Sequence, residues 1–83
     1  MHPNHQLPLD IARLRFQLAR RKMNKEIKDM DIIRDYMLHL YLGDDPLAVS
    51  ILRVQIGIVL AAIEAYQVAG EHLVVVERLL EKA

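Results

Sequence analysis

The sequence has no cysteine, no tryptophan and no threonine, and Ser50 is its only serine. Without cysteine the chain has no disulfide framework, no thiolate zinc site and no cysteine nucleophile. Ser50 is the sole hydroxyl nucleophile, and no histidine stands four residues from it. The sequence also lacks a glycine-rich phosphate loop and the Glu-x-x-His motif of di-iron bundles. We therefore expect no catalytic residue, no metal site and no cofactor, and hence a protein that is not an enzyme.

Long uncharged hydrophobic runs are missing as well. The longest one in the apolar C-terminal half is Val54 to Ile63, ten residues, whereas about 20 are needed to span a bilayer. Residues 1–9 are polar and contain no apolar segment typical of a secretory signal. The lack of cysteine fits a reducing compartment. These observations predict a cytoplasmic protein with no membrane span.

What the chain has in excess is apolar residues, which make up 53% of 83 positions at zero net charge. This composition excludes intrinsic disorder. A domain of this length buries only about 60–65% of the surface that its unfolded chain exposes. A lone small domain has too little interior for so many apolar side chains. We therefore expect part of the apolar surface to lie in a subunit interface.

Glycine and proline are few, and their positions divide the chain into two helical halves. After Pro8 the next glycine or proline is Gly43, followed by Pro46. Gly43 suits the left-handed position after a helix end, while Asp45 and Pro46 suit the cap and first residue of the next helix. The sequence predicts a flexible tail over 1–7 and a single helical domain over 8–83. Within that domain we expect a helix over about 8–42, a turn over 43–45 and a helix over about 46–82.

Apolar residues in the first half recur with heptad spacing, which predicts a helix that packs against another helix along its length. The series is Leu9, Ala12, Phe16, Ala19, Met23, Glu26, Met30, Ile33, Met37 and Leu40. Its Phe16, Met23, Met30 and Met37 predict a core stripe of an antiparallel hairpin or, alternatively, a face that docks a partner helix. A break in this helix is conceivable at Asn24, which is a good capping residue.

The second half carries two apolar seams that point in nearly opposite directions at 100° per residue. One seam is Leu52, Ile56, Val59, Ile63, Tyr66, Gly70, Leu73, Glu77 and Leu80. The other is Ile51, Val54, Ile58, Ala61, Ala65, Val68, His72, Val75 and Leu79. Since a two-helix hairpin covers only one of them, we predict that the seam from Ile51 to Leu79 is a homo-oligomer interface, in a four-helix bundle or a higher symmetric assembly. His72 would be either an ordinary interface histidine or a proton switch.

The zero net charge hides an asymmetry. Residues 1–28 hold seven basic and two acidic side chains, a net charge of +5, whereas residues 29–83 hold four basic and nine acidic ones, a net charge of −5. The basic side chains predict either a solvated face that pairs with acidic groups of the other helix or subunit, or contacts to nucleic-acid phosphates. The candidate phosphate contacts are Arg13, Arg20, Arg21, Lys25 and Lys28.

At the expected turn, Tyr41-Leu42-Gly43 places an aromatic residue two positions before a glycine. In this it resembles the WXG100 class of small secreted helical hairpins, which carry tryptophan at the aromatic position. The resemblance implies export by a specialised secretion system. The hypothesis favoured by the whole sequence is a non-enzymatic, all-α, homo-oligomeric interaction or regulatory protein with itself and another protein as partners. A nucleic-acid-binding regulator and a secreted WXG100-like hairpin are the alternatives.

Overall fold

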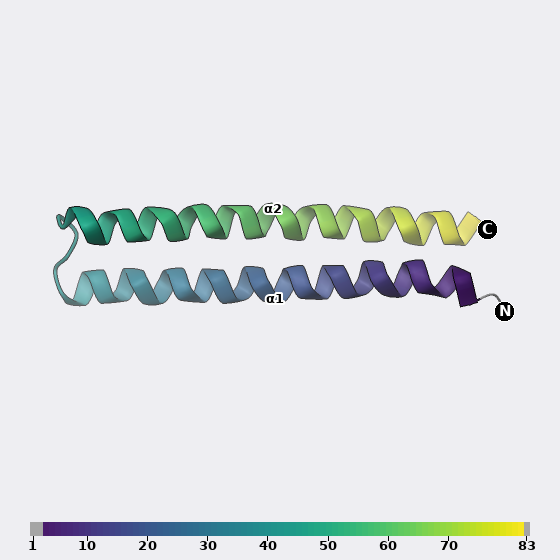
Figure 1. The fold of residues 1–83 in the computed structure, drawn as a ribbon, viewed down its shortest axis with the longest axis horizontal. Coiled ribbons are helices and arrows are strands. Elements are labelled where there is room, and N and C mark those ends of the chain that lie inside the picture. Colours follow the sequence, from purple (N-terminus) through teal and green to yellow (C-terminus); the bar gives the residue numbers. More distant parts are fainter. Residues whose placement is uncertain (1–2, 83) are drawn as a thin grey trace.

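The computed structural model describes residues 3–82, with side chains from residue 6 on, and this part of the chain forms two α-helices. α1 spans Pro3–His39 and α2 spans Pro46–Lys82. The helices lie side by side and antiparallel, so both chain ends lie at the same end of the molecule (Figure 1). The Cα atoms extend over 61 × 14 × 13 Å, which makes the protein a thin rod. The prediction of an all-α antiparallel hairpin is confirmed.

α1 begins earlier than the sequence indicated. Its first residue is Pro3, so residues 3–7 are helical and do not form the predicted tail; Met1 and His2 lie outside the described residues. The error came from Pro8, which suits the first position of a helix. Pro3 meets the same requirement, and Pro8 lies inside the helix. α1 also continues through Asn24, so the break considered there does not occur.

The end of α1 is set by Tyr41. The N–H of Leu42 donates to the carbonyl of Met37 at 2.8 Å, and the N–H of Tyr41 donates to the carbonyl of Leu38 at 3.4 Å. These two bonds form a Schellman motif, in which the residue after the helix cap is left-handed. That residue is Tyr41, with φ of 55°. The prediction that Gly43 takes this position is wrong, because α1 ends at His39 and the motif closes before Gly43 is reached.

The start of α2 follows the sequence prediction. The Oδ1 atom of Asp45 accepts hydrogen bonds from the backbone N–H groups of Leu47 at 2.9 Å and Ala48 at 3.0 Å. Asp45 therefore caps the helix, and Pro46 is its first residue. α2 then runs unbroken through Gly57 and Gly70 to Lys82. The two helices are consequently equal in length, at 37 residues each.

The heptad series of α1 faces α2 along the hairpin. Every member from Leu9 to Met37 is buried or half-buried, and only Leu40, beyond the helix end, is exposed. α2 contributes Val59 and Ala62, each 5% exposed, to the same interface. Near the middle of the rod, the rings of Phe16 and Tyr66 stack with centroids 5.0 Å apart. The seam of α2 that contains Val59 and Tyr66 is therefore the one covered by α1.

Candidate interaction surface

The other seam of α2, the predicted oligomer interface, is exposed along the hairpin. Val54 is 65% exposed, Leu79 is 63% exposed, and the least exposed of its large side chains, Ile58, is still 40% exposed. The remaining members of this seam are also exposed: Ile51, Ala61, Ala65, Val68, His72 and Val75. We call this surface the outer seam. α1 leaves it uncovered because a single neighbouring helix can bury only one side of α2.

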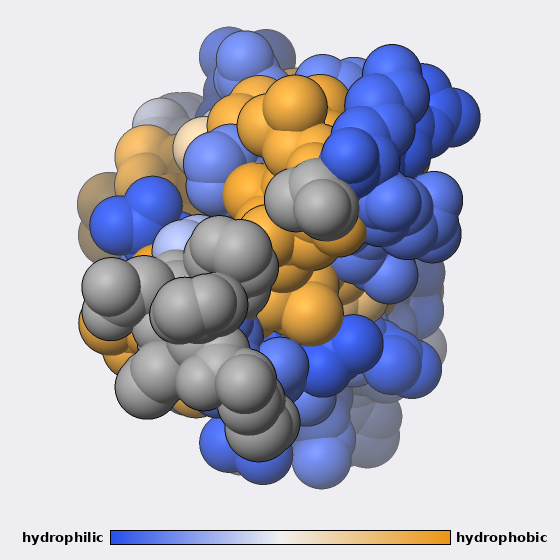
Figure 2. Space-filling model, turned by 90° about the vertical axis from the view of Figure 1, so that its right-hand side faces the viewer, coloured by the Kyte–Doolittle hydropathy of each residue, from blue (hydrophilic) through white to orange (hydrophobic). Residues whose placement is uncertain are grey.

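The end of the rod shows how much apolar surface stays open. Figure 2 views the end at which both termini lie, where orange apolar side chains run across the middle and recur at the left-hand edge. Blue polar side chains lie at the top, the right and the bottom of this view. The hairpin is therefore apolar on part of its circumference as well as between its helices. Contiguous exposed apolar surface of this kind marks interaction sites in soluble proteins.

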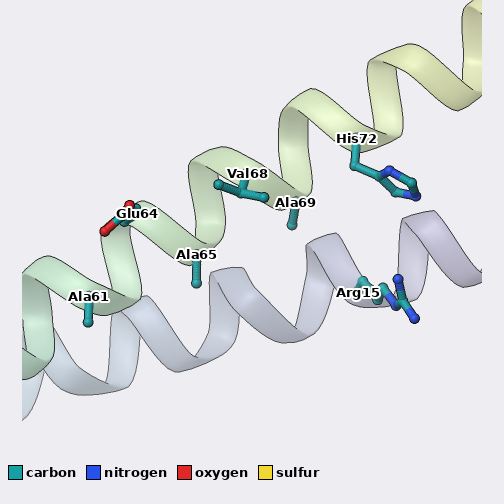
Figure 3. A pocket seen from close by; sticks show the side chains of 7 residues that line it. All are labelled: Arg15, Ala61, Glu64, Ala65, Val68, Ala69 and His72. Atoms are coloured by element: carbon teal, nitrogen blue, oxygen red, sulfur yellow. The ribbon is translucent and has the colours of Figure 1, made fainter.

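The middle of the outer seam forms a shallow groove next to α1. Small and apolar residues of α2 line it, together with one acidic, one imidazole and one guanidinium side chain: Ala61, Glu64, Ala65, Val68, Ala69, His72 and Arg15. Figure 3 shows that Arg15 rises from α1, whereas Glu64 lies on the side of α2 away from α1. The groove thus has a basic edge on α1 and an acidic edge on α2.

Each edge of the groove extends by one heptad. Lys22 lies seven residues after Arg15, and Glu71 lies seven residues after Glu64, so each pair shares a helix face. Lys22 and Glu71 are exposed, as Arg15 and Glu64 are. Among the described residues every ion pair lies within α1, so the basic edge is not neutralised by α2 of its own chain. Sequence analysis did not single out Arg15, although its charge beside an apolar series was a usable signal.

The alternative partner face on α1 is occupied. Phe16, Met23 and Met30 are half-buried, and Met37 is 9% exposed, all against α2. These side chains form the core stripe of the hairpin, which was the first of the two interpretations of their spacing. A partner helix would have to displace α2 to reach them.

The candidate nucleic-acid contacts are exposed but do not form one surface. At 100° per residue, Arg13 and Arg20 lie on one side of α1, and Arg21, Lys25 and Lys28 lie on another. The Nζ atom of Lys25 is 3.4 Å from Oδ2 of Asp29 and 3.7 Å from Oε1 of Glu26. The hydrogen bond and charge of Asp29 raise the pKa of Lys25, with a further contribution from Glu26. Lys25 is thus engaged within its own helix.

The polar groups of α2 that could take part in acid–base or nucleophilic chemistry do not converge. Glu64 and His72 line the same groove, yet both are exposed, and neither has a hydrogen-bond partner among the described side chains. Ser50 is exposed near the start of α2. Over the described part of the chain, no three histidine or acidic side chains lie close enough to hold a metal ion. The arrangement offers surface for contact, with no assembled acid–base pair.

Sequence analysis also missed Gln55, the polar link between the helices. Its Nε2 donates to the backbone carbonyl of Glu26 at 3.0 Å and to Oε2 of Glu26 at 2.9 Å. Glu26 is the lone polar member of its heptad series and lies 14 residues before Leu40, and Gln55 lies 14 residues after Tyr41. That equal spacing was a signal that could have paired them.

By length and composition α2 can cross a membrane, a property that its ten-residue uncharged run did not indicate. Residues 46–63 contain one charged side chain, Arg53. Only 11% of the most apolar 18-residue stretch is buried in the hairpin. Composition alone is weak evidence for a membrane span, because a soluble helix that packs on two sides has the same composition.

Comparisons with family models, with curated proteins and with solved structures gave no match. The Tyr41-Leu42-Gly43 turn is thus the whole basis of the WXG100 resemblance. The turn itself is present, with Tyr41 93% exposed.

Proposed function

We propose that this protein is a non-enzymatic helical adaptor or regulator that acts as a homo-oligomer, with a second copy of the chain covering the outer seam of α2. The observation that carries the proposal is the exposure of that seam, from Ile51 to Leu79, on a helix already packed on its opposite side. Assembly would complete a helix bundle and bury the second apolar side of α2. The helix faces left outside would remain for a protein partner.

The size of the exposed surface supports a second copy as the occupant. The hairpin exposes 6731 Å². A compact monomer of 9.6 kDa is expected to expose about 5,100 Å², so the excess is roughly 1,600 Å². A stable interface takes about 800 Å² from each partner. The excess exposed area is therefore large enough for an interface of ordinary size. Two rods that pair side by side bury their long sides, where most of their surface lies.

Sedimentation equilibrium at low micromolar concentration tests the proposal. The wild-type chain is expected to sediment as an oligomer, and Ile58→Asp is expected to dissociate it by placing a charge in the outer seam. Val74→Asp is the matched control, because Val74 is 44% exposed, close to the 40% of Ile58, and lies about 160° around the helix from Ile58. A wild-type chain that is a well-folded monomer would overturn the proposal.

A nucleic-acid-binding regulator remains the second candidate, since Arg13, Arg20, Arg21 and Lys28 form no ion pair within the described hairpin. Fluorescence anisotropy with duplex DNA and with single-stranded RNA at two salt concentrations tests it. Phosphate contacts would give binding that weakens steeply as salt rises. Absence of binding at low salt excludes this candidate.

A further inference from the structure

The outer seam is an apolar strip with oppositely charged edges. Arg15 lines it on the α1 side and Glu64 on the far side of α2. By heptad spacing, Lys22 and Glu71 share the helix faces of these two residues. The two edges overlap in height along the rod, because Arg15 lies opposite His72, which follows Glu71, and Lys22 lies seven residues nearer the turn, toward the height of Glu64. The edges thus form two short parallel rows, basic at Arg15 and Lys22 and acidic at Glu64 and Glu71, and each row changes sign at the next heptad position, Asp29 and Arg78.

A second copy can cover this strip with either of two symmetry axes lying in the contact plane. Rotation by 180° about an axis across the rod exchanges the two ends of the second copy, and it leaves each charged edge on its own side of the strip. It therefore sets the Arg15 edge against the Arg15 edge of the second copy, and Glu64 against Glu64. Rotation by 180° about an axis along the rod leaves every residue of the second copy at the same position along the rod, and it exchanges the two charged edges. It sets Arg15 and Lys22 along Glu64 and Glu71 of the second copy.

We infer that two hairpins pair about an axis along the rod, so that both turns lie at the same end and the basic edge of each copy meets the acidic edge of the other. This inference rests on the proposed homo-oligomer and adds its orientation and its charged contacts. Opposite charges along an interface fix the orientation of the partners, and like charges placed together oppose the alternative. The pairing also supplies the acidic partners that the described hairpin does not give to Arg15 and Lys22.

Disulfide cross-linking distinguishes the two orientations, because the chain contains no native cysteine. Leu47, four residues before Ile51, extends the outer seam at the turn end and is 71% exposed, and Leu79 marks the other end. With the axis along the rod, Leu47→Cys and Leu79→Cys each cross-link to themselves, and a mixture of the two gives no mixed disulfide above background. With the axis across the rod, only the mixed disulfide forms. Gln67→Cys, exposed on another face of α2, measures the collisional background.

Charge reversal tests the edges themselves. Arg15→Glu and Glu71→Lys are each expected to raise the dissociation constant by at least about tenfold, because each places like charges across the interface. The double variant Arg15→Glu/Glu71→Lys is expected to restore assembly, since these two charges lie at the same height and are exchanged across the interface. Circular dichroism of the four proteins checks that the helices are retained. Unchanged assembly of both single variants would overturn the inference, because reversing a charge that faces its own copy only replaces one like-charge contact with another.

The outcomes separate the inference from the proposed function. A monomer by sedimentation that gives only background cross-linking overturns both. An oligomer that yields the mixed Leu47→Cys and Leu79→Cys disulfide keeps the homo-oligomer and overturns the orientation. An oligomer that cross-links at Leu47→Cys with itself, and is rescued by the double charge reversal, supports both.

Discussion

The side-chain amide of Gln55 on α2 donates to both the backbone carbonyl and the carboxylate of Glu26 on α1, at 3.0 and 2.9 Å. Glu26 is the one polar residue in the heptad series that faces α2, and its side chain is 14% exposed. The amide satisfies a carboxylate that would otherwise be held in an apolar interface without a partner from α2. These two residues therefore fix the register of one helix against the other.

We expect Gln55→Ala to lower the free energy of unfolding by about 1.5–3 kcal/mol, because a half-buried carboxylate loses a charged hydrogen bond. Urea denaturation at fixed protein concentration measures the change. Gln67→Ala, an exposed glutamine on the same helix, should change stability by less than about 0.5 kcal/mol. Equal effects of the two substitutions would show that the link to Glu26 contributes nothing.

The two glycines of α2 should respond differently to alanine. A Cβ atom at Gly57 meets nothing within 4 Å, so Gly57→Ala should stabilise the helix by about 1 kcal/mol. A Cβ atom at Gly70 would lie 3.2 Å from Cε1 of Phe16, whose ring is stacked on Tyr66. Gly70→Ala should therefore gain less stability than Gly57→Ala and should alter the near-ultraviolet circular dichroism of the stack. An equal gain at both positions would contradict this assignment.

Glycine is expected to be better than tyrosine at the end of α1. Tyr41 adopts a φ of 55°, a conformation that costs a residue with a Cβ about 1–2 kcal/mol, and its side chain is 93% exposed. Tyr41→Gly should therefore raise the midpoint of urea denaturation, by an amount equivalent to about 1 kcal/mol. Gly43→Ala is the control, since Gly43 has a negative φ and open space around it. A loss of stability in Tyr41→Gly would mean that the tyrosine ring makes a stabilising contact.

Stability of the assembled protein should depend on its concentration. If folding and dimerisation are linked, each tenfold rise in concentration adds about 1.4 kcal/mol and raises Tm by about 4 °C for a pair of chains this size. Differential scanning calorimetry over a hundredfold range of concentration measures the slope. Ile58→Asp should melt at a lower Tm with no such slope. A wild-type Tm that is constant over the range would argue against an obligate assembly.

Local patterns made most of the fold predictable. The heptad series from Leu9 to Met37 identified the face of α1 that packs on α2, and Asp45 and Pro46 identified the start of α2. The two errors were at the ends of α1. At the start of α1, both Pro3 and Pro8 suit the first position of a helix. At its end, Tyr41 adopts a left-handed conformation that tyrosine does not favour.

The sequence predicted only part of the candidate interaction surface. The sequence listed the outer seam, but its charged edges join residues far apart in the chain, such as Arg15 and Val68. A helical pattern reports only neighbours within one helix. Whether Arg15 lies beside the outer seam depends on how each helix is rotated about its own axis. That rotation is set only when the two helices pack against each other.

By itself the sequence determined two long helices, the turn between them and two apolar sides on the second helix, because these follow from periodicity and from glycine and proline positions. Only the tertiary structure decided which side of α2 is covered. Both sides are apolar, and the choice follows from packing Val59 and Ala62 against α1, with Gln55 bonded to Glu26. That choice leaves Ile51 to Leu79 exposed between a basic and an acidic edge, and so locates the surface on which a second copy is proposed to lie.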